Sequence, residues 1–265
     1  MEKLEQLVDD LHLEDLRNEL HPSFFDENDG YDMLIVRLPI INATLEAKSI
    51  GFVIADDKSY LYDKTKKLFD ETGDKFEGPY KILDKILDKF LKSFTYYQDT
   101  VADLEENMYE DKVTDDFMKN WLALKKDIVR IERLLLRSSL TIDELIEFYE
   151  HEEAFPINHY IDLHEHMERT MRSAGLQLSK LDYLYSFYTA RTNDKMNKMI
   201  FILTLLSAVF LPLNLVVGFF GMNTSGLPFA GGSMGTLNAV LLMVSLLLVS
   251  SGVLYLWKGK TDKNI

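Results

Sequence analysis

Residues 199–223 read MIFILTLLSAVFLPLNLVVGFFGMN, and this stretch decides the fold. It opens a longer segment, residues 199–257, in which none of the 59 side chains is charged. A helical hairpin buried in a soluble core is the weaker interpretation, because such helices rarely run this long without a charge. The sequence therefore predicts that this part of the chain lies in lipid.

A glycine-rich loop divides the apolar segment in two. Residues 221–235 hold five Gly residues and Pro228, which oppose helix formation. The flanking spans, 199–220 and 236–257, have 22 residues each, about 33 Å at 1.5 Å per residue. Because a hydrocarbon core is about 30 Å thick, we expect two C-terminal transmembrane helices.

Basic residues flank the two spans on one side of the membrane only. They are Arg191, Lys195 and Lys198 before the first span and Lys258, Lys260 and Lys263 in the tail, residues 258–265. The first residues, MEKLEQ, lack the apolar run of a cleavable secretory signal. We expect a multi-pass protein of the cell inner (plasma) membrane, with both termini cytoplasmic and the loop 221–235 outside.

The rest of the chain is strongly acidic. Residues 1–195 hold 42 acidic and 25 basic side chains, and the whole chain of 265 residues has a formal net charge of -14. Such a surface repels nucleic acid, so no nucleic-acid partner is expected. The chain has no Cys and none of the glycine-rich nucleotide motifs or common hydrolase motifs, so we expect neither an enzyme nor a cofactor.

Residues 1–156 are expected to form an acidic cytoplasmic α/β domain. An amphipathic helix over 3–20 ends before a turn at 26–30. Aromatic and β-branched residues predict strands over 31–39 and 44–55, with a turn at 56–59 into a further strand. These strands predict a small antiparallel sheet.

Long helices are expected to fill the remainder of the chain. After Gly78 the apolar residues recur every three or four positions, with breaks predicted at 105–116 and 138–153. From Ile157 no cluster of Gly and Pro interrupts the sequence, so one helix of about 60 residues should run to residue 220. Its part 157–198 would form a stalk, and the fold class is α+β with long helices.

Small and polar side chains share one face of this long helix. Steps of three and four residues lead through Asn197, Ile200, Thr204, Ser207, Leu211, Asn214, Gly218 and Gly221. A period of 3.5 residues is typical of parallel copies that supercoil around one another. One interpretation is a packing face between membrane helices. The other is a water-filled lumen, which Asn214 favours because an amide is costly in hydrocarbon.

Two further patterns could carry chemistry. The region 151–168 is rich in His and Glu, and His164 and Glu168 have the i, i+4 spacing that places two metal ligands on one helix face. A weak regulatory metal site is one interpretation and a solvated helix face is the other. Asn223 begins an Asn-Thr-Ser glycosylation pattern, which a position at a pore mouth disfavours.

The end of the first span resembles the CorA family of divalent-cation (Mg2+/Co2+) transporters. The resemblance lies in Pro212, Asn214 and residues 218–223, GFFGMN, which close the penultimate hydrophobic span just before a short loop. Residues 13–16 and 31–37 are also similar to the family's early helix and first strands. The resemblance thus covers most of the chain.

The resemblance implies a funnel-shaped homopentameric channel embedded in membrane lipid. Gly221, Met222 and Asn223 would form the selectivity filter at the outer mouth. The implied pore-lining and gate residues are Asn197, Ile200, Leu203, Thr204, Ser207, Leu211, Asn214 and Gly218.

The expected function is uptake of a divalent cation, with Mg2+ first and Co2+ or Ni2+ as similarly hydrated ions. Neutral oxygens suit Mg2+, which gives up its water reluctantly, and no imidazole or thiolate lies in the membrane segment. However, the outer loop has no Asp or Glu, and residues 226–228 are similar to the loop of the ZntB-like branch. Zn2+ transport, possibly proton-coupled, is therefore an alternative. A membrane-anchored coiled-coil scaffold is an alternative of another class.

Overall fold

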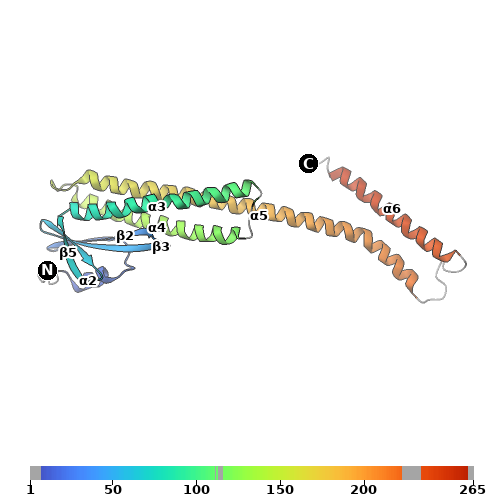
Figure 1. Ribbon diagram of the computed structural model, residues 1–265, viewed down its shortest axis with the longest axis horizontal. Helices are drawn as coiled ribbons and strands as arrows, with labels where there is room; N and C mark the ends of the chain where they lie inside the picture. The colour runs from blue at the N-terminus through green and yellow to red at the C-terminus, as the bar shows by residue number, and fades with distance from the viewer. Residues whose placement is uncertain (1–6, 111, 113–115, 223–233, 262–265) are drawn as a thin grey trace. The chain divides into compact units, whose positions relative to one another are not determined.

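The computed structural model describes residues 7–110, 112, 116–222 and 234–261 (Figure 1). The chain divides into two compact units, Met1–Ser186 and Phe187–Ile265. The first unit combines an antiparallel sheet with long helices, which confirms the predicted α+β fold class.

The sheet of the first unit has five antiparallel strands in the order of the sequence. They are β1 (Phe24–Asn28), β2 (Tyr31–Ile41), β3 (Leu45–Ala55), β4 (Lys58–Asp63) and β5 (Leu68–Asp74). The predicted central strands are confirmed, and the long β2–β3 ladder pairs Asp32 with Ile54 at one end and Ile41 with Leu45 at the other. The turn predicted at 26–30 is shorter than expected, because β1 continues to Asn28 and leaves Asp29 and Gly30 as the turn.

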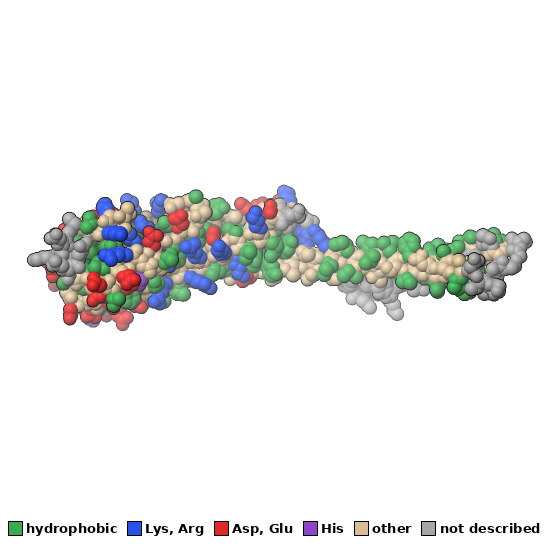
Figure 2. All heavy atoms as spheres, turned by 90° about the horizontal axis from the view of Figure 1, so that it is seen from below, with side chains coloured by type: hydrophobic (Ala, Val, Ile, Leu, Met, Phe, Trp, Pro, Cys, Tyr) green, Lys and Arg blue, Asp and Glu red, His purple; other side chains and the backbone are tan. Residues whose placement is uncertain are grey.

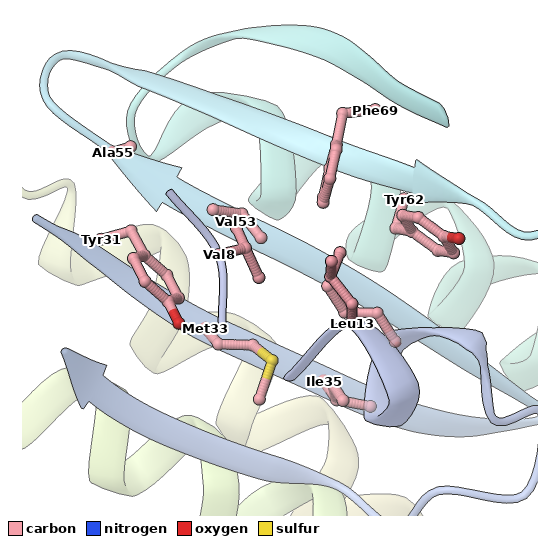
Figure 3. Close-up of a cluster of buried hydrophobic side chains, with 10 residues drawn as sticks. Val8, Leu13, Tyr31, Met33, Ile35, Val53, Ala55, Tyr62 and Phe69 are labelled. Atoms are coloured by element: carbon pink, nitrogen blue, oxygen red, sulfur yellow. The ribbon is translucent and has the colours of Figure 1, made fainter. Parts of the chain in front are cut away.

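Helix α2 (Asp10–Arg17) covers one face of the sheet. Its buried side chains meet those of the strands in the hydrophobic cluster of Figure 3, which comprises Val8, Leu13, Leu16, Tyr31, Met33, Ile35, Val53, Ala55, Tyr62 and Phe69. Gly51 allows this close approach, since a Cβ atom there would lie 2.4 Å from Leu16 Cδ2. The alternate residues of β2 and β3 point to the opposite face and are also buried, so the sheet is covered on both sides.

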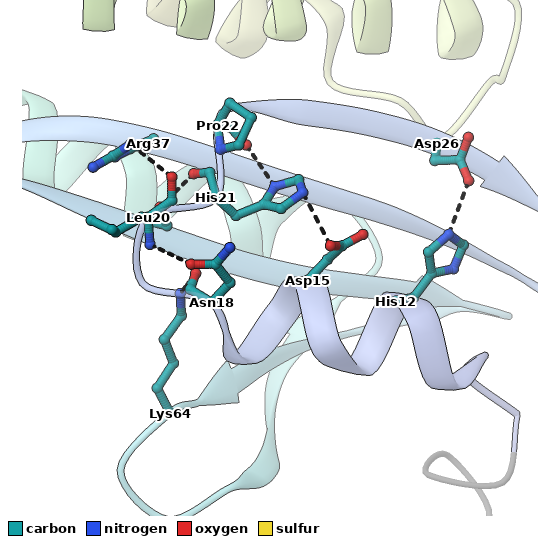
Figure 4. Close-up of polar contacts among 10 residues, drawn as sticks. His12, Asp15, Asn18, Leu20, His21, Pro22, Asp26, Arg37 and Lys64 are labelled. Atoms are coloured by element: carbon teal, nitrogen blue, oxygen red, sulfur yellow. Dashed lines mark hydrogen bonds and ion pairs between the residues drawn. The ribbon is translucent and has the colours of Figure 1, made fainter.

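The predicted helix 3–20 is corrected at its C-terminus. Asn18 has an extended backbone (φ -71°, ψ 115°), so α2 ends at Arg17 rather than Leu20. Asn18 Oδ1 accepts a hydrogen bond from the backbone N–H of Leu20 at 2.9 Å, and its carbonyl accepts one from Lys64 Nζ at 2.7 Å (Figure 4). These local bonds satisfy the N–H group of Leu20 and the carbonyl of Asn18, which a longer helix would have paired within itself.

Two antiparallel helices, α3 (Glu77–Tyr109) and α4 (Phe117–Tyr149), pack against strand β2. The break predicted at 138–153 begins later than expected, because α4 continues without interruption to Tyr149 and the non-helical segment covers residues 150–156. The polar residues that suggested it are used in tertiary contacts: Ser138 Oγ donates to the carbonyl of Arg37 at 2.9 Å and lies 3.0 Å from Ser23 Oγ. A buried hydroxyl with such partners does not oppose a helix.

Trp121 packs helix α4 against the first part of α5, within the same unit. Its indole Nε1–H donates to the carbonyl of Leu181 at 2.7 Å, and the ring stacks on Tyr185 with 4.9 Å between centroids. Lys125 Nζ lies 5.0 Å above the ring and pairs with Asp182 Oδ1 at 2.6 Å. This contact packs α4 against α5 at residues 181–186, which are the last six residues of the first unit.

We expect Trp121→Ala to lower the free energy of unfolding by about 3–5 kcal/mol, because a buried aromatic ring and a buried hydrogen bond are lost together. Urea denaturation of the detergent-solubilised protein, followed by far-ultraviolet circular dichroism, measures the change. Trp121→Phe keeps the stacking on Tyr185 and should cost less. Equal stability of the Ala variant and the wild type would show that the contact is not needed.

Candidate functional site

The predicted long helix is present as a single element. Helix α5 runs from Ile157 to Gly221, 65 residues, and continues through Pro212. Its apolar part is long enough and apolar enough to cross a membrane. A second helix, α6 (Gly235–Thr261), follows, and within the described residues its apolar core is the shorter segment Val240–Ser250.

In the unit Phe187–Ile265, the face of α5 predicted to line a lumen is exposed over its whole length. All eight members of the register are exposed: Asn197, Ile200, Thr204, Ser207, Leu211, Asn214, Gly218 and Gly221. Leu203, beside this line, is 65% exposed and Leu211 is 68% exposed. Figure 2 shows the apolar part of α5, which follows Lys198, without red or blue side chains, as its sequence requires.

The covered face of α5 lies on the other side of the helix. Val216 is only 7% exposed, and Val209, Leu213 and Phe220 are half-buried. Each of these four residues follows a register member by two positions, which is a rotation of about 200° at 3.6 residues per turn. On α6 the half-buried positions Met243, Leu246 and Ser250 are also spaced by three and four residues. The line is therefore open to another copy or to a lumen, as are most of the other positions in residues 199–222, which are also exposed.

Hydroxyl groups on the exposed line are turned back onto their own helix. Thr204 Oγ1 donates to the carbonyl of Ile200 at 2.8 Å, and Ser207 Oγ donates to the carbonyl of Leu203 at 2.9 Å. Their donors are thereby satisfied, while the oxygen lone pairs remain free to accept. Within the described part of the chain, the amides of Asn197 and Asn214 make no hydrogen bond. The line thus offers neutral oxygen acceptors between aliphatic side chains, with no charge from Ile200 to Gly221.

The predicted filter is described only in part. Gly221 ends α5 and Met222 is 48% exposed, whereas Asn223 lies outside the described residues. The exposed line of α5 therefore ends at Gly221, which is the first residue of the Gly-Met-Asn motif.

The predicted metal pair on α5 has other contacts. Glu168 Oε2 pairs with Arg172 Nη1 at 2.8 Å, and His164 is half-buried. Nearby, His159 Nδ1 lies 3.1 Å from Glu77 Oε1 and its ring stacks on Tyr80. Burial, with a smaller effect of neighbouring Asp88, raises the pKa of Asp84. No three His, Asp or Glu side chains are grouped to hold a metal ion within the described ranges.

An acidic α+β unit whose long helix α5 ends in the uncharged span 199–221, with oxygen acceptors along one exposed face, is the arrangement expected of a membrane ion transporter. The chain belongs to the CorA-like Mg2+ transporter protein family, whose sequence model matches residues 1–258. It is therefore a divalent-cation transporter rather than an enzyme.

Three relatives illustrate this membership. The zinc transport protein ZntB of Vibrio parahaemolyticus is 24% identical over 231 residues, which cover 83% of this chain and 72% of ZntB. The putative metal ion transporter YfjQ of Bacillus subtilis is 22% identical, covering 94% of this chain and 82% of YfjQ. The structure of the CorA magnesium transporter from Methanocaldococcus jannaschii shares the fold, with a TM-score of 0.74 and 18% identity over 94% of this chain and 83% of that one.

Proposed function

We propose that the chain forms a homopentameric channel of the inner membrane that takes up Mg2+ through a lumen lined by residues 197–221 of α5. Two transmembrane helices per subunit, formed by α5 and α6, would carry it. One observation supports the proposal above all: the line of small and oxygen-bearing side chains is exposed over its whole length, and the less exposed positions Val209, Leu213, Val216 and Phe220 lie on the opposite side of the helix.

The chemistry of this line suits a cation that keeps its water. Mg2+ dehydrates reluctantly, and the amide oxygen of Asn214 can accept hydrogen bonds from its coordinated waters. Rings of Ile200, Leu203 and Leu211 would narrow the lumen and exclude water when closed. An ion would therefore wait at the polar ring and cross only when the aliphatic rings separate.

The electrostatics of the first unit support cation transport. Residues 1–195 carry 17 more acidic than basic side chains, and several copies around one axis would multiply this charge. A surface of one sign raises the local concentration of the opposite ion. Cations would accordingly gather near the cytoplasmic end of the lumen.

The identity of the ion is the point at which the relatives differ, since one is called a zinc transporter and the family description names Mg2+. Zn2+ in proteins prefers imidazole and thiolate ligands. The segment 197–222 contains neither His nor Cys, which favours Mg2+ and similarly hydrated Co2+ or Ni2+. Proton-coupled Zn2+ transport is the second candidate.

Purified protein in liposomes separates the two candidates. Flux of Mg2+, Zn2+, Co2+ and Ni2+ is measured in parallel, with and without an imposed pH gradient. We expect saturable Mg2+ flux that does not depend on the gradient. Zn2+ flux that follows the pH gradient, with no flux of Mg2+, would establish the alternative.

The membrane topology gives a further prediction. Because the six basic flanking residues lie on one side and the loop carries none, we expect residues 224–235 to be external. A cysteine introduced as Ser225→Cys should react with an impermeant maleimide added to intact cells, and the chain offers no competing thiol. Labelling only after permeabilisation would place the loop inside and refute the topology.

A further inference from the structure

A groove between α4 and β2 in the first unit is lined by six cationic side chains and no acidic one. The cations are Arg37 from β2 and Lys125, Lys126, Arg130, Arg133 and Arg137 from α4. The apolar part of the lining includes Leu122, Val129 and Leu134. The chain has 43 acidic and 29 basic residues, so a groove lined by basic side chains without an acidic one is unlike the rest of its surface.

The cations on α4 repel one another. Lys126, Arg130, Arg133 and Arg137 follow at steps of four, three and four residues, which places them on one face of the helix. Like charges at such spacing destabilise a helix. Within the described residues, Lys126, Arg133 and Arg137 have no ion pair that would offset the repulsion. The charge of the groove is left for a ligand to neutralise.

The wall formed by Arg37 is fixed before any ligand arrives. Its backbone N–H donates to Ser23 Oγ at 2.8 Å, and its carbonyl accepts from Ser138 Oγ at 2.9 Å. Its Nη1 donates to the carbonyl of Leu20 at 2.7 Å, as Figure 4 shows, while its buried Nε–H has no partner among the described residues. These bonds go to neutral groups, so the guanidinium keeps its full charge.

The basic side chains of the groove differ in how far their charge is already compensated. Lys125 is already paired with Asp182 Oδ1 at 2.6 Å and lies over the ring of Trp121. Arg130 Nη1 donates to the carbonyl of Leu45 at 3.2 Å, and Arg130 has no ion pair with any residue that the structure describes. The uncompensated charge is therefore concentrated around Arg130, Arg133 and Arg137, beside aliphatic side chains.

We propose that this groove binds a nucleoside polyphosphate. Guanidinium groups bind phosphate oxygens in pairs of parallel hydrogen bonds, and four of the six cations are Arg. The phosphates lie along Arg130, Arg133 and Arg137, and the nucleoside covers Leu122 and Val129. A carboxylate surface of a second copy would neutralise the same charge. It would not supply a flat, apolar group, such as a nucleobase, to cover Leu122 and Val129. This site is separate from the ion pathway and does not depend on the proposed ion.

The test is calorimetric titration of the full-length protein, in neutral detergent with a chelator present, with ATP and with inorganic triphosphate. We expect saturable ATP binding that weakens at high salt, and weaker binding of triphosphate, which lacks the nucleoside. The variant Arg133→Gln/Arg137→Gln should reduce ATP affinity at least tenfold. The control Lys85→Gln/Lys89→Gln removes two exposed charges at the same spacing from α3, where Asp84 and Asp88 alternate with them, and should bind as the wild type does.

Other outcomes overturn the proposal. Absence of saturable ATP binding, or equal affinity in the Arg variant and the wild type, removes the nucleotide from the groove. A change in oligomeric mass in the Arg variant, measured by light scattering, assigns the groove to contact between copies. The same titration in nanodiscs of phosphatidylcholine, with and without phosphatidylglycerol, tests the other source of phosphate. Loss of ATP binding in the anionic nanodiscs alone assigns the groove to a lipid headgroup.

Discussion

Asn223→Ala is expected to abolish saturable divalent-cation uptake while the oligomer stays assembled. In the proposed channel, a ring of Asn amides at the outer mouth accepts hydrogen bonds from the waters of the arriving ion. Hydrogen bonds to charged species contribute roughly 1.5–3 kcal/mol each, so loss of the ring should lower affinity by more than tenfold. Liposome flux against ion concentration measures the effect.

Two neighbouring variants make this result specific. Thr224→Ala removes a side-chain oxygen at the next position and should leave uptake near the wild-type level. Asn223→Gln keeps an amide and should restore part of the uptake. Wild-type flux through Asn223→Ala would refute the filter role, and loss of the oligomer would make Asn223 a structural residue.

The sequence predicted the centre of the sheet and missed its edges. Strands β2 and β3 are buried on both faces and therefore consist largely of apolar and β-branched residues. The edge strands β1 and β5 read FFDEN and LFDETGD, and their polar residues face solvent or neighbouring loops. Edge strands avoid long apolar runs, so their sequences resemble turns. Only pairing with β2 and β4 reveals them.

The early start predicted for the break after α4 has a related cause. Ser138, Ser139 and Thr141 read as helix breakers because hydroxyl groups compete for backbone hydrogen bonds. All three are buried against the rest of the unit, and Ser138 bonds to the carbonyl of Arg37 on a distant strand. A tertiary partner 101 residues away cannot be inferred from a local pattern.

The candidate pathway was easier to predict than the basic groove. The register on α5 is one line on one helix, so spacing alone reveals the pattern, and its role as an ion pathway stays a prediction. Four of the five groove cations on α4 have equally regular spacing, which is a signal that could have been found. Their meaning depends on Arg37, which comes from a strand and meets them only in the folded unit. A site assembled from two elements needs the fold, whereas a face of one helix does not.

Leu211→Gly is expected to give a leaky channel, with flux that persists at high internal Mg2+. Leu211 is 68% exposed on the proposed lumen face, one turn from Asn214. In a ring of copies its branched side chain would form a water-excluding constriction, and Gly would leave that constriction wide and wet. Leu211→Phe fills the same position with a larger apolar group and should suppress flux.

The control for Leu211→Gly is Leu213→Gly, which makes the same substitution on the half-buried face, about 200° around the helix. Both variants carry the intrinsic cost of glycine in a helix, about 1 kcal/mol, so any shared loss reflects helix stability rather than the lumen. Flux at low and high internal Mg2+ is compared for all three variants, with oligomeric mass checked by light scattering. Wild-type behaviour of both Leu211 variants would mean that Leu211 does not line the constriction and that the lumen faces another side of α5.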